Sequence, residues 1–131
     1  MLGKLALLYV KMAAATTPAI NSAAMQNANS TMGGLKAPES CADMAQLRAA
    51  IDALDQELVA LMARRQAYIE RAAVLKSDRA TVRDEARIEA VVTKVLAEAR
   101  AAGLSPAIAE AVWRVLIERS IAHEFTAFDA K

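Results

Sequence analysis

The longest hydrophobic pattern in the chain runs from Met44 to Lys76 and predicts one long helix. Apolar or small residues recur there at steps of three and four, the spacing of a single buried helical stripe. The stretch contains no Pro or Gly, and Asp43 with Gln46 three residues later fits an N-cap and its reciprocal partner. At about 1.5 Å per residue this helix would be roughly 50 Å long, so we expect one end to project and to need a partner. The stripe comprises Leu47, Ile51, Leu54, Leu58, Leu61, Tyr68, Ala72 and Leu75.

Two shorter helices follow. Arg83-Asp84-Glu85 opens the second, with acids in its first turn as the helix dipole favours, and Gly103 is placed to end it. Ser105 followed by Pro106 is an N-cap with proline at the first helical position, which predicts the start of the third. With no strand pattern and no repeat, the chain is expected to be all-α, with three helices of which the first is far the longest. The apolar faces of the two shorter helices comprise Ile88, Val91, Val92, Val95, Leu96 and Ala99, and Ile108, Val112, Trp113, Leu116, Ile117, Ile121, Phe125 and Phe128.

Residues 1–40 differ from the rest of the chain, because they are rich in Ala, Ser, Thr, Asn, Gly and Met and have no sustained period. We interpret them as a disordered or processed leader and residues 41–131 as one helical domain. Lys4 precedes an apolar run that Lys11 interrupts, so a secretory signal is the less favoured alternative. No apolar stretch reaches transmembrane length, and we therefore expect a cytoplasmic protein with no membrane partner.

Charge and cysteine content exclude several classes of function. Lys and Arg together number 16 and Asp and Glu 15, a balance that provides no basic surface for nucleic acid. Cys41 is the single cysteine, which excludes an internal disulfide and a multi-thiolate metal site. His123, the single histidine, lacks the neighbouring ligands that a zinc site needs. We expect neither a metal nor a nucleic-acid partner.

Two cations interrupt the apolar stripe of the first helix. Arg65 occupies a position that the periodicity assigns to an apolar residue, and Lys76 follows eleven residues later. On a helix the two lie roughly 20° apart around the axis and about 16 Å apart along it. Two long side chains at that separation could lean toward one ligand held between them. The alternative is that both extend along their aliphatic stems to the surface.

Ser120 and Glu124 lie one turn apart on the apolar side of the third helix. A serine hydroxyl in a helix commonly bonds back to its own backbone, which is the ordinary interpretation of Ser120. A glutamate facing the core is more informative, because burial favours the neutral carboxyl, which can donate a hydrogen bond. The alternative for Glu124 is a position at the rim, paired with an arginine or with His123.

Three further charged residues complete the set of candidates. Asp84 and Arg87 form either a surface ion pair at i,i+3 or one wall of a pocket near Lys76. Arg48 lies about 25 Å along the first helix from Arg65, too far for both to hold one small molecule from the same chain. Two long helices running antiparallel in a two-fold dimer would bring them together. The set suits a small dianion, and the sequence has no nucleophile–base pair and no cofactor loop.

The fragments Leu47–Asp55, Leu61–Arg65 and Val74–Lys76 precede Val82–Asp84 with Arg87, and Leu116–Ile121 follows in the third helix. In this order and at near-family spacing they resemble the all-helical chorismate mutases over about residues 44 to 128. The resemblance implies the chorismate mutase type II fold, an intertwined homodimer with shared active sites. It also implies a cofactor-free rearrangement of chorismate to prephenate in aromatic amino acid biosynthesis, with no covalent intermediate.

Carried over by position, the partner subunit's Arg48 and Arg65 would hold the two carboxylates of the substrate. Lys76 would donate to the ether oxygen, which gains negative charge as the carbon–oxygen bond breaks, and Ser120 would assist a carboxylate. A pericyclic step needs no acid, base or nucleophile. It does gain from holding a rare compact conformer and from fixed donors aimed at the developing charge.

Two positions depart from the typical pattern of this family. Asp84 and Arg87 would order the pocket near the ring hydroxyl of the substrate, but Ile88 stands where a glutamate usually binds that hydroxyl. Glu124 stands where glutamine usually donates to the ether oxygen, and it can donate only when protonated. An apolar residue at 88 is similar to the sister branch, the isochorismate pyruvate lyases of salicylate and siderophore synthesis.

Three functions therefore compete. Chorismate mutase is the first choice, and isochorismate pyruvate lyase is the alternative within the same fold. The third is a non-catalytic helical dimerisation module in which Arg65 and Lys76 merely reach the surface.

Overall fold

The computed structural model describes residues 34–131. In that range the chain forms the 3-10 helix η1 (Pro38–Ser40), α3 (Met44–Leu75), the 3-10 helix η2 (Arg79–Thr81), α4 (Glu85–Ala102) and α5 (Pro106–Asp129). Residues 34–131 contain no strand, so the predicted all-α fold with a very long first helix is confirmed. Most of the predicted leader, 1–40, lies outside the described residues. Its last residues carry η1.

Local signals account for the ends of the helices. Asp43 caps α3, because its Oδ1 accepts a hydrogen bond from the backbone N of Gln46 at 2.8 Å. The Gln46 side chain reciprocates one residue earlier than expected, accepting from Ala42 N at 3.1 Å. Gly103 ends α4 in the left-handed conformation, with φ of 77°, which a residue without a Cβ adopts without strain. Pro106 begins α5, but the hydroxyl of Ser105 makes no capping bond.

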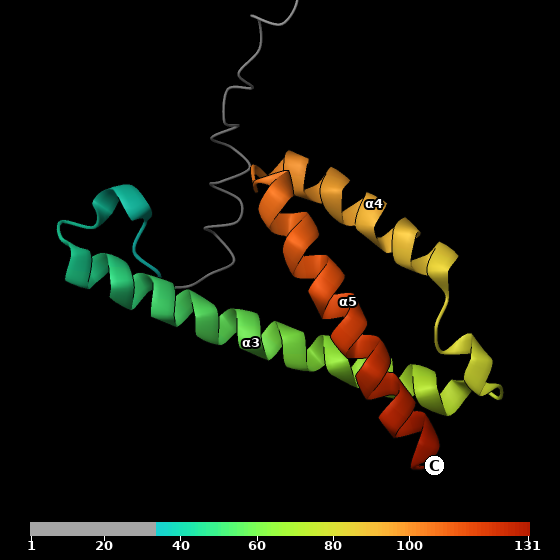
Figure 1. The fold of residues 1–131 in the computed structure, drawn as a ribbon. Helices are drawn as coiled ribbons and strands as arrows, with labels where there is room; N and C mark the ends of the chain where they lie inside the picture. Colours follow the sequence, from blue (N-terminus) through green and yellow to red (C-terminus); the bar gives the residue numbers. More distant parts are fainter. Residues whose placement is uncertain (1–33) are drawn as a thin grey trace, which may run out of the picture.

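The three α-helices meet at one end of the molecule. α5 packs against both α3 and α4, and the N-terminal half of α3 projects away from them (Figure 1). The buried core cluster joins Ile88 and Val92 of α4 to Ile117 of α5, and residues packed against it include Trp113. The site described below therefore lies at the end of α3 where all three α-helices come together.

The predicted apolar face of α4 is confirmed, whereas that of α5 needs a correction in its first two turns. Ile108 and Val112 are 57% and 50% exposed, and Ala109 is fully buried in their place. The turn that joins α4 and α5 is short, so the two helices lie close together beside it. Only small side chains fit between them there, and Ala99 of α4 is buried in the same way.

The apolar stripe of α3 is largely uncovered within one chain. Ala73 is the buried residue of this helix, whereas Ile51 and Leu58 on the projecting half are about half exposed, at 49% and 47%. Such a row on a projecting helix is typical of a protein–protein contact. Within residues 34–131, no helix combines the length and the hydropathy required to cross a membrane.

Candidate active site

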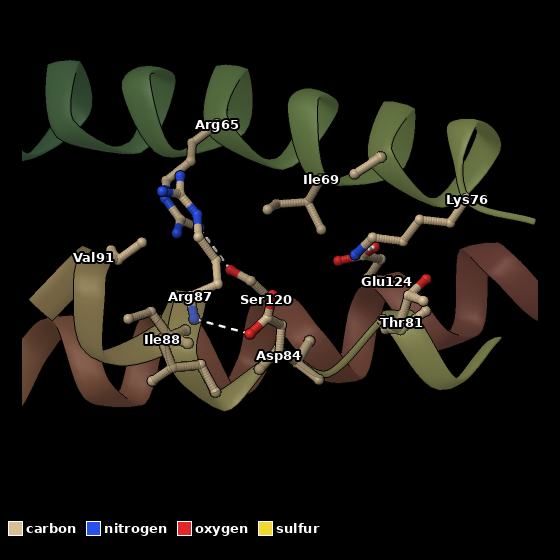
Figure 2. Close-up of a pocket in the computed structure, with 14 residues that line it drawn as sticks. Arg65, Ile69, Lys76, Thr81, Asp84, Arg87, Ile88, Val91, Ser120 and Glu124 are labelled. Atoms are coloured by element: carbon tan, nitrogen blue, oxygen red, sulfur yellow. Dashed lines mark hydrogen bonds and ion pairs between the residues drawn. The ribbon is translucent and has the colours of Figure 1, made fainter. Parts of the chain in front are cut away.

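A pocket of about 380 Å³ lies between α3, α4 and α5 (Figure 2). One part of its lining is apolar and the other is polar or charged, a combination typical of sites for small organic molecules. The apolar lining consists of Ile69, Ala72, Val82, Ile88, Val91, Ile117 and Ile121. The polar lining consists of Arg65, Lys76, Thr81, Asp84, Arg87, Ser120 and Glu124.

Arg65 extends from α3 into this pocket and contacts α5 (Figure 2). Its Nη1 donates to Ser120 Oγ at 2.7 Å, so the partner in this contact is a neutral hydroxyl. Partial burial lowers the pKa of the Arg65 guanidinium, because desolvation disfavours the charged form. A guanidinium nonetheless remains charged in proteins, and the cation can accept an anionic ligand.

Ser120 makes two hydrogen bonds through its hydroxyl, one of which is the bond to its own helix that the sequence predicts. Its Oγ donates to Leu116 O, four residues earlier in the same helix, at 2.7 Å. The same oxygen accepts the hydrogen bond from Arg65. Because the donor proton of the hydroxyl is used within the helix, the oxygen is left as an acceptor that orients Arg65 in the pocket.

Lys76 follows the last residue of α3 and forms the ion pair of the site. Its Nζ lies 2.6 Å from Glu124 Oε1, and the residue Glu124 is only 5% exposed. His123, the alternative partner for Glu124, instead lies with its Nε2 2.7 Å from Glu70 Oε1. Glu124 therefore faces the pocket and accepts a hydrogen bond from Lys76. An ammonium has three donor protons, so Lys76 retains two for a ligand.

Asp84 and Arg87 both line the pocket, which is one of the two arrangements that the sequence left open, and their side chains do not form the ion pair of the other. Asp84 Oδ1 instead accepts from the backbone N of Arg87 at 2.9 Å, because Asp84 is the N-cap of α4. Ile88, the next residue, is 8% exposed and belongs both to the core and to the pocket lining. The pocket is therefore apolar at this position.

Arg48 is the sequence candidate that the pocket does not include. It is an exposed residue near the start of α3, on the half that projects from the other helices. Thr81 and Val82 are pocket residues that the sequence did not single out. They belong to the connection between α3 and α4, and its aperiodic sequence gives no signal except its position shortly after Lys76.

The arrangement brings three cations, Arg65, Lys76 and Arg87, to one cavity with hydrogen-bonding groups and apolar walls. This geometry can bind a compact dianion and direct donors at an oxygen that becomes negative. Among residues 34–131 there is no group of three His, Cys, Asp or Glu side chains that could hold a metal ion.

Comparison with known proteins gives two matches. Residues 47–125 match the family described as chorismate mutase type II. A curated relative is an isochorismate pyruvate lyase of Pseudomonas aeruginosa, 29% identical over 90 residues, which cover 69% of this chain and 89% of that protein. The match to the family spans all the pocket residues, from Arg65 to Glu124.

Proposed function

We propose that this chain, which belongs to the chorismate mutase type II family, is an enzyme that rearranges chorismate to prephenate without a cofactor. The observation that carries the proposal is the convergence of Arg65 and Lys76 on one pocket, each fixed by a group of α5. A dianionic substrate supplies two carboxylates and an ether oxygen, which match separate cations.

The proposed mechanism is electrostatic and conformational. Arg65 binds one carboxylate, and the apolar walls favour the compact conformer in which the reacting carbons approach each other. Lys76 donates to the ether oxygen as its bond to carbon breaks. Because Glu124 holds the ammonium before the substrate arrives, little reorganisation is needed when charge develops, and such preorganised donors contribute most of the stabilisation.

The proposed enzyme is a homodimer with shared sites. The half-exposed apolar residues Ile51 and Leu58 lie on the projecting half of α3, where a second copy would cover them. Arg48 lies on the same half and outside the pocket of its own chain. In a two-fold dimer, the partner subunit's Arg48 would reach the pocket and bind the second carboxylate.

A second candidate function is isochorismate pyruvate lyase, which yields salicylate and pyruvate. It is favoured by the apolar Ile88 in the pocket, where the mutase resemblance leads us to expect a carboxylate for the ring hydroxyl. The similarity to the lyase of Pseudomonas aeruginosa supports it as well. The same cations would serve both reactions, because both break the same kind of carbon–oxygen bond.

The deciding experiment incubates the purified protein separately with chorismate and with isochorismate and identifies the products by chromatography. We expect prephenate from chorismate. Salicylate and pyruvate as the predominant products would assign the lyase function instead. Lys76→Ala, purified in parallel, controls for mutase carried over from the expression host. Turnover of neither substrate above that control would favour a non-catalytic dimerisation module.

A further inference from the structure

The C-terminus of α3 is capped by a residue far away in the sequence. α3 ends at Leu75, and its last carbonyl groups have no partner further along the helix. Lys131 Nζ donates to Ala73 O at 2.8 Å and also to Lys76 O, across 55 residues of sequence. A cation at this end of a helix also complements the negative pole of its dipole. The ammonium of Lys131 therefore holds the backbone from which the Lys76 side chain departs.

A second contact holds the middle of the same connection. Arg79, in η2, donates from Nε and Nη2 to the two carboxylate oxygens of Asp129, at 2.7 and 3.1 Å. Its guanidinium also lies over the ring of Phe125, 4.5 Å from the centroid. Lys131 is held in a similar way, with Nζ 3.7 Å from the centroid of Phe128. One ion pair, hydrogen bonds to backbone carbonyls and cation–π contacts thus join the start and the middle of the connection to the end of α5 and to Lys131 beyond it.

The connection held in this way forms part of the active-site wall. Lys76 begins it, and Thr81 and Val82 at its end line the pocket. Glu124, which holds the Lys76 ammonium, lies only five residues before Asp129 on α5. The end of α5 therefore fixes Lys76 twice, by its side chain through Glu124 and by its backbone through Lys131.

We propose that Asp129 and Lys131 are positioning residues that hold the connection from Lys76 to Val82 and aim the Lys76 ammonium into the pocket. The kinetic part of this inference rests on the proposed function. The Arg79–Asp129 pair is exposed, and exposed ion pairs contribute little to global stability. A donor displaced by about 1 Å, in contrast, can reduce catalysis by about 100-fold. We call the contacts of Asp129 and Lys131 with this connection the clamp. Loss of the clamp should therefore affect turnover far more than folding.

The test compares Lys131→Met with Lys131→Arg, which keeps a cation of similar reach, and with Lys94→Met as a matched control on the exposed surface of α4. For Lys131→Met we expect kcat to fall by roughly 10- to 100-fold with KM changed by less than about threefold, because the lost alignment acts in the transition state. Lys131→Arg should recover most of this loss. Asp129→Asn tests the same clamp from its other contact, should Lys131→Met fail to fold.

Amide hydrogen exchange provides a readout that needs no substrate. Peptides covering residues 76–82 should exchange faster in Lys131→Met than in the wild type or in Lys94→Met, while peptides of α4 stay unchanged. Unchanged exchange in 76–82 would overturn the clamp. Faster exchange with a normal kcat would overturn the positioning role. If the wild type turns over neither substrate, the proposed function fails, and the exchange alone decides whether the clamp exists.

Discussion

Lys76 Nζ and Glu124 Oε1 lie 2.6 Å apart, although 48 residues separate them in the sequence. The pair joins the end of α3 to the last third of α5 at the pocket, with the Glu124 side chain nearly buried. Removing one partner of a buried ion pair commonly costs about 3–5 kcal/mol, because the other charge is left without compensation. Replacing Lys76 leaves the carboxylate of Glu124, the nearly buried partner, without compensation, so Lys76→Ala should lower the free energy of unfolding.

Arg65 and Lys76 should each be essential for turnover but not for folding. Removing one preorganised donor from a transition-state oxyanion commonly costs about 100- to 1,000-fold, so Lys76→Ala should lose that much in kcat/KM. Arg65→Ala removes the cation that binds a substrate carboxylate and should also lower kcat/KM. Arg64→Ala, which removes the exposed neighbour of Arg65, serves as the matched control. Steady-state kinetics and circular dichroism, measured on the same preparations, separate loss of activity from loss of structure. Near-normal activity of Lys76→Ala would show that its proposed role is wrong.

A shared active site predicts recovery of activity on mixing two inactive variants. In a heterodimer of Arg48→Ala and Arg65→Ala, one of the two pockets keeps both arginines, whereas each variant alone has two defective pockets. With complete exchange of subunits, about half of the dimers are heterodimers, so roughly a quarter of the wild-type activity should return. Native mass spectrometry of differently tagged variants would verify the exchange. Full exchange without any recovery would exclude a site that borrows Arg48.

Ion pairs on the surface predict a loss of stability in acid. Hydrogen bonds from Arg83 lower the pKa of Glu118 below its ordinary value of 4.5, and those from Arg114 lower the pKa of Glu89 in the same way. Because the pKa values are lower in the folded state, the unfolded chain binds more protons below about pH 4.5, and stability falls as the pH falls. The melting temperature should therefore be constant from pH 7 to about 5 and decrease below that.

Substitution tests whether Glu118 contributes to this decrease of the melting temperature in acid. Glu118→Gln should make the decrease of the melting temperature between about pH 4.5 and 3 shallower, because one carboxylate with a lowered pKa is removed. Glu98→Gln removes an exposed carboxyl of α4 that takes part in neither ion pair and should leave the slope unchanged. Both variants are compared with the wild type at one protein concentration, because dissociation of a dimer would also change the melting temperature. Equal slopes for all three proteins would contradict the assignment.

The elements of the fold were predictable because their signals are local. The period of three and four residues in α3, the cap at Asp43 and the stop at Gly103 depend only on neighbouring residues. The burial of Ala109 in place of Ile108 was not predictable, because it depends on how closely α4 and α5 approach beside their turn. Periodicity alone does not decide which of two adjacent apolar residues of a helix is buried when one of them is small and the other large.

The sequence identified several residues of the candidate site but not the contacts between them. Polar side chains at apolar positions marked Arg65, Ser120 and Glu124, because each breaks a pattern. Their partners could not be read from the sequence, since rotamers and helix packing decide whether Lys76 meets Glu124 or another group. Thr81 also lines the pocket, but the sequence around it has no periodic pattern. Such a connection gives no indication of which of its side chains face the pocket.

Replacing Glu124 with glutamine should raise activity, because a carboxylate offers only acceptors whereas an amide also offers donors. Glu124 Oε1 accepts from Lys76 in the structure, and an ionised carboxylate beside the ether oxygen would repel the charge that develops there. The amide of glutamine would instead donate to that oxygen. A hydrogen bond to a charged group is worth about 1.5–3 kcal/mol, so Glu124→Gln should raise kcat/KM roughly 10- to 100-fold.

Steady-state kinetics of the wild type and Glu124→Gln, measured at one pH, test this role. The amide of glutamine keeps an oxygen that can accept from Lys76 and adds a donor for the ether oxygen, so kcat/KM of the variant should exceed that of the wild type. Glu98→Gln, an exposed substitution on α4, should leave kcat/KM unchanged. A kcat/KM for Glu124→Gln at or below that of the wild type would mean that Glu124 acts only by holding Lys76 in place.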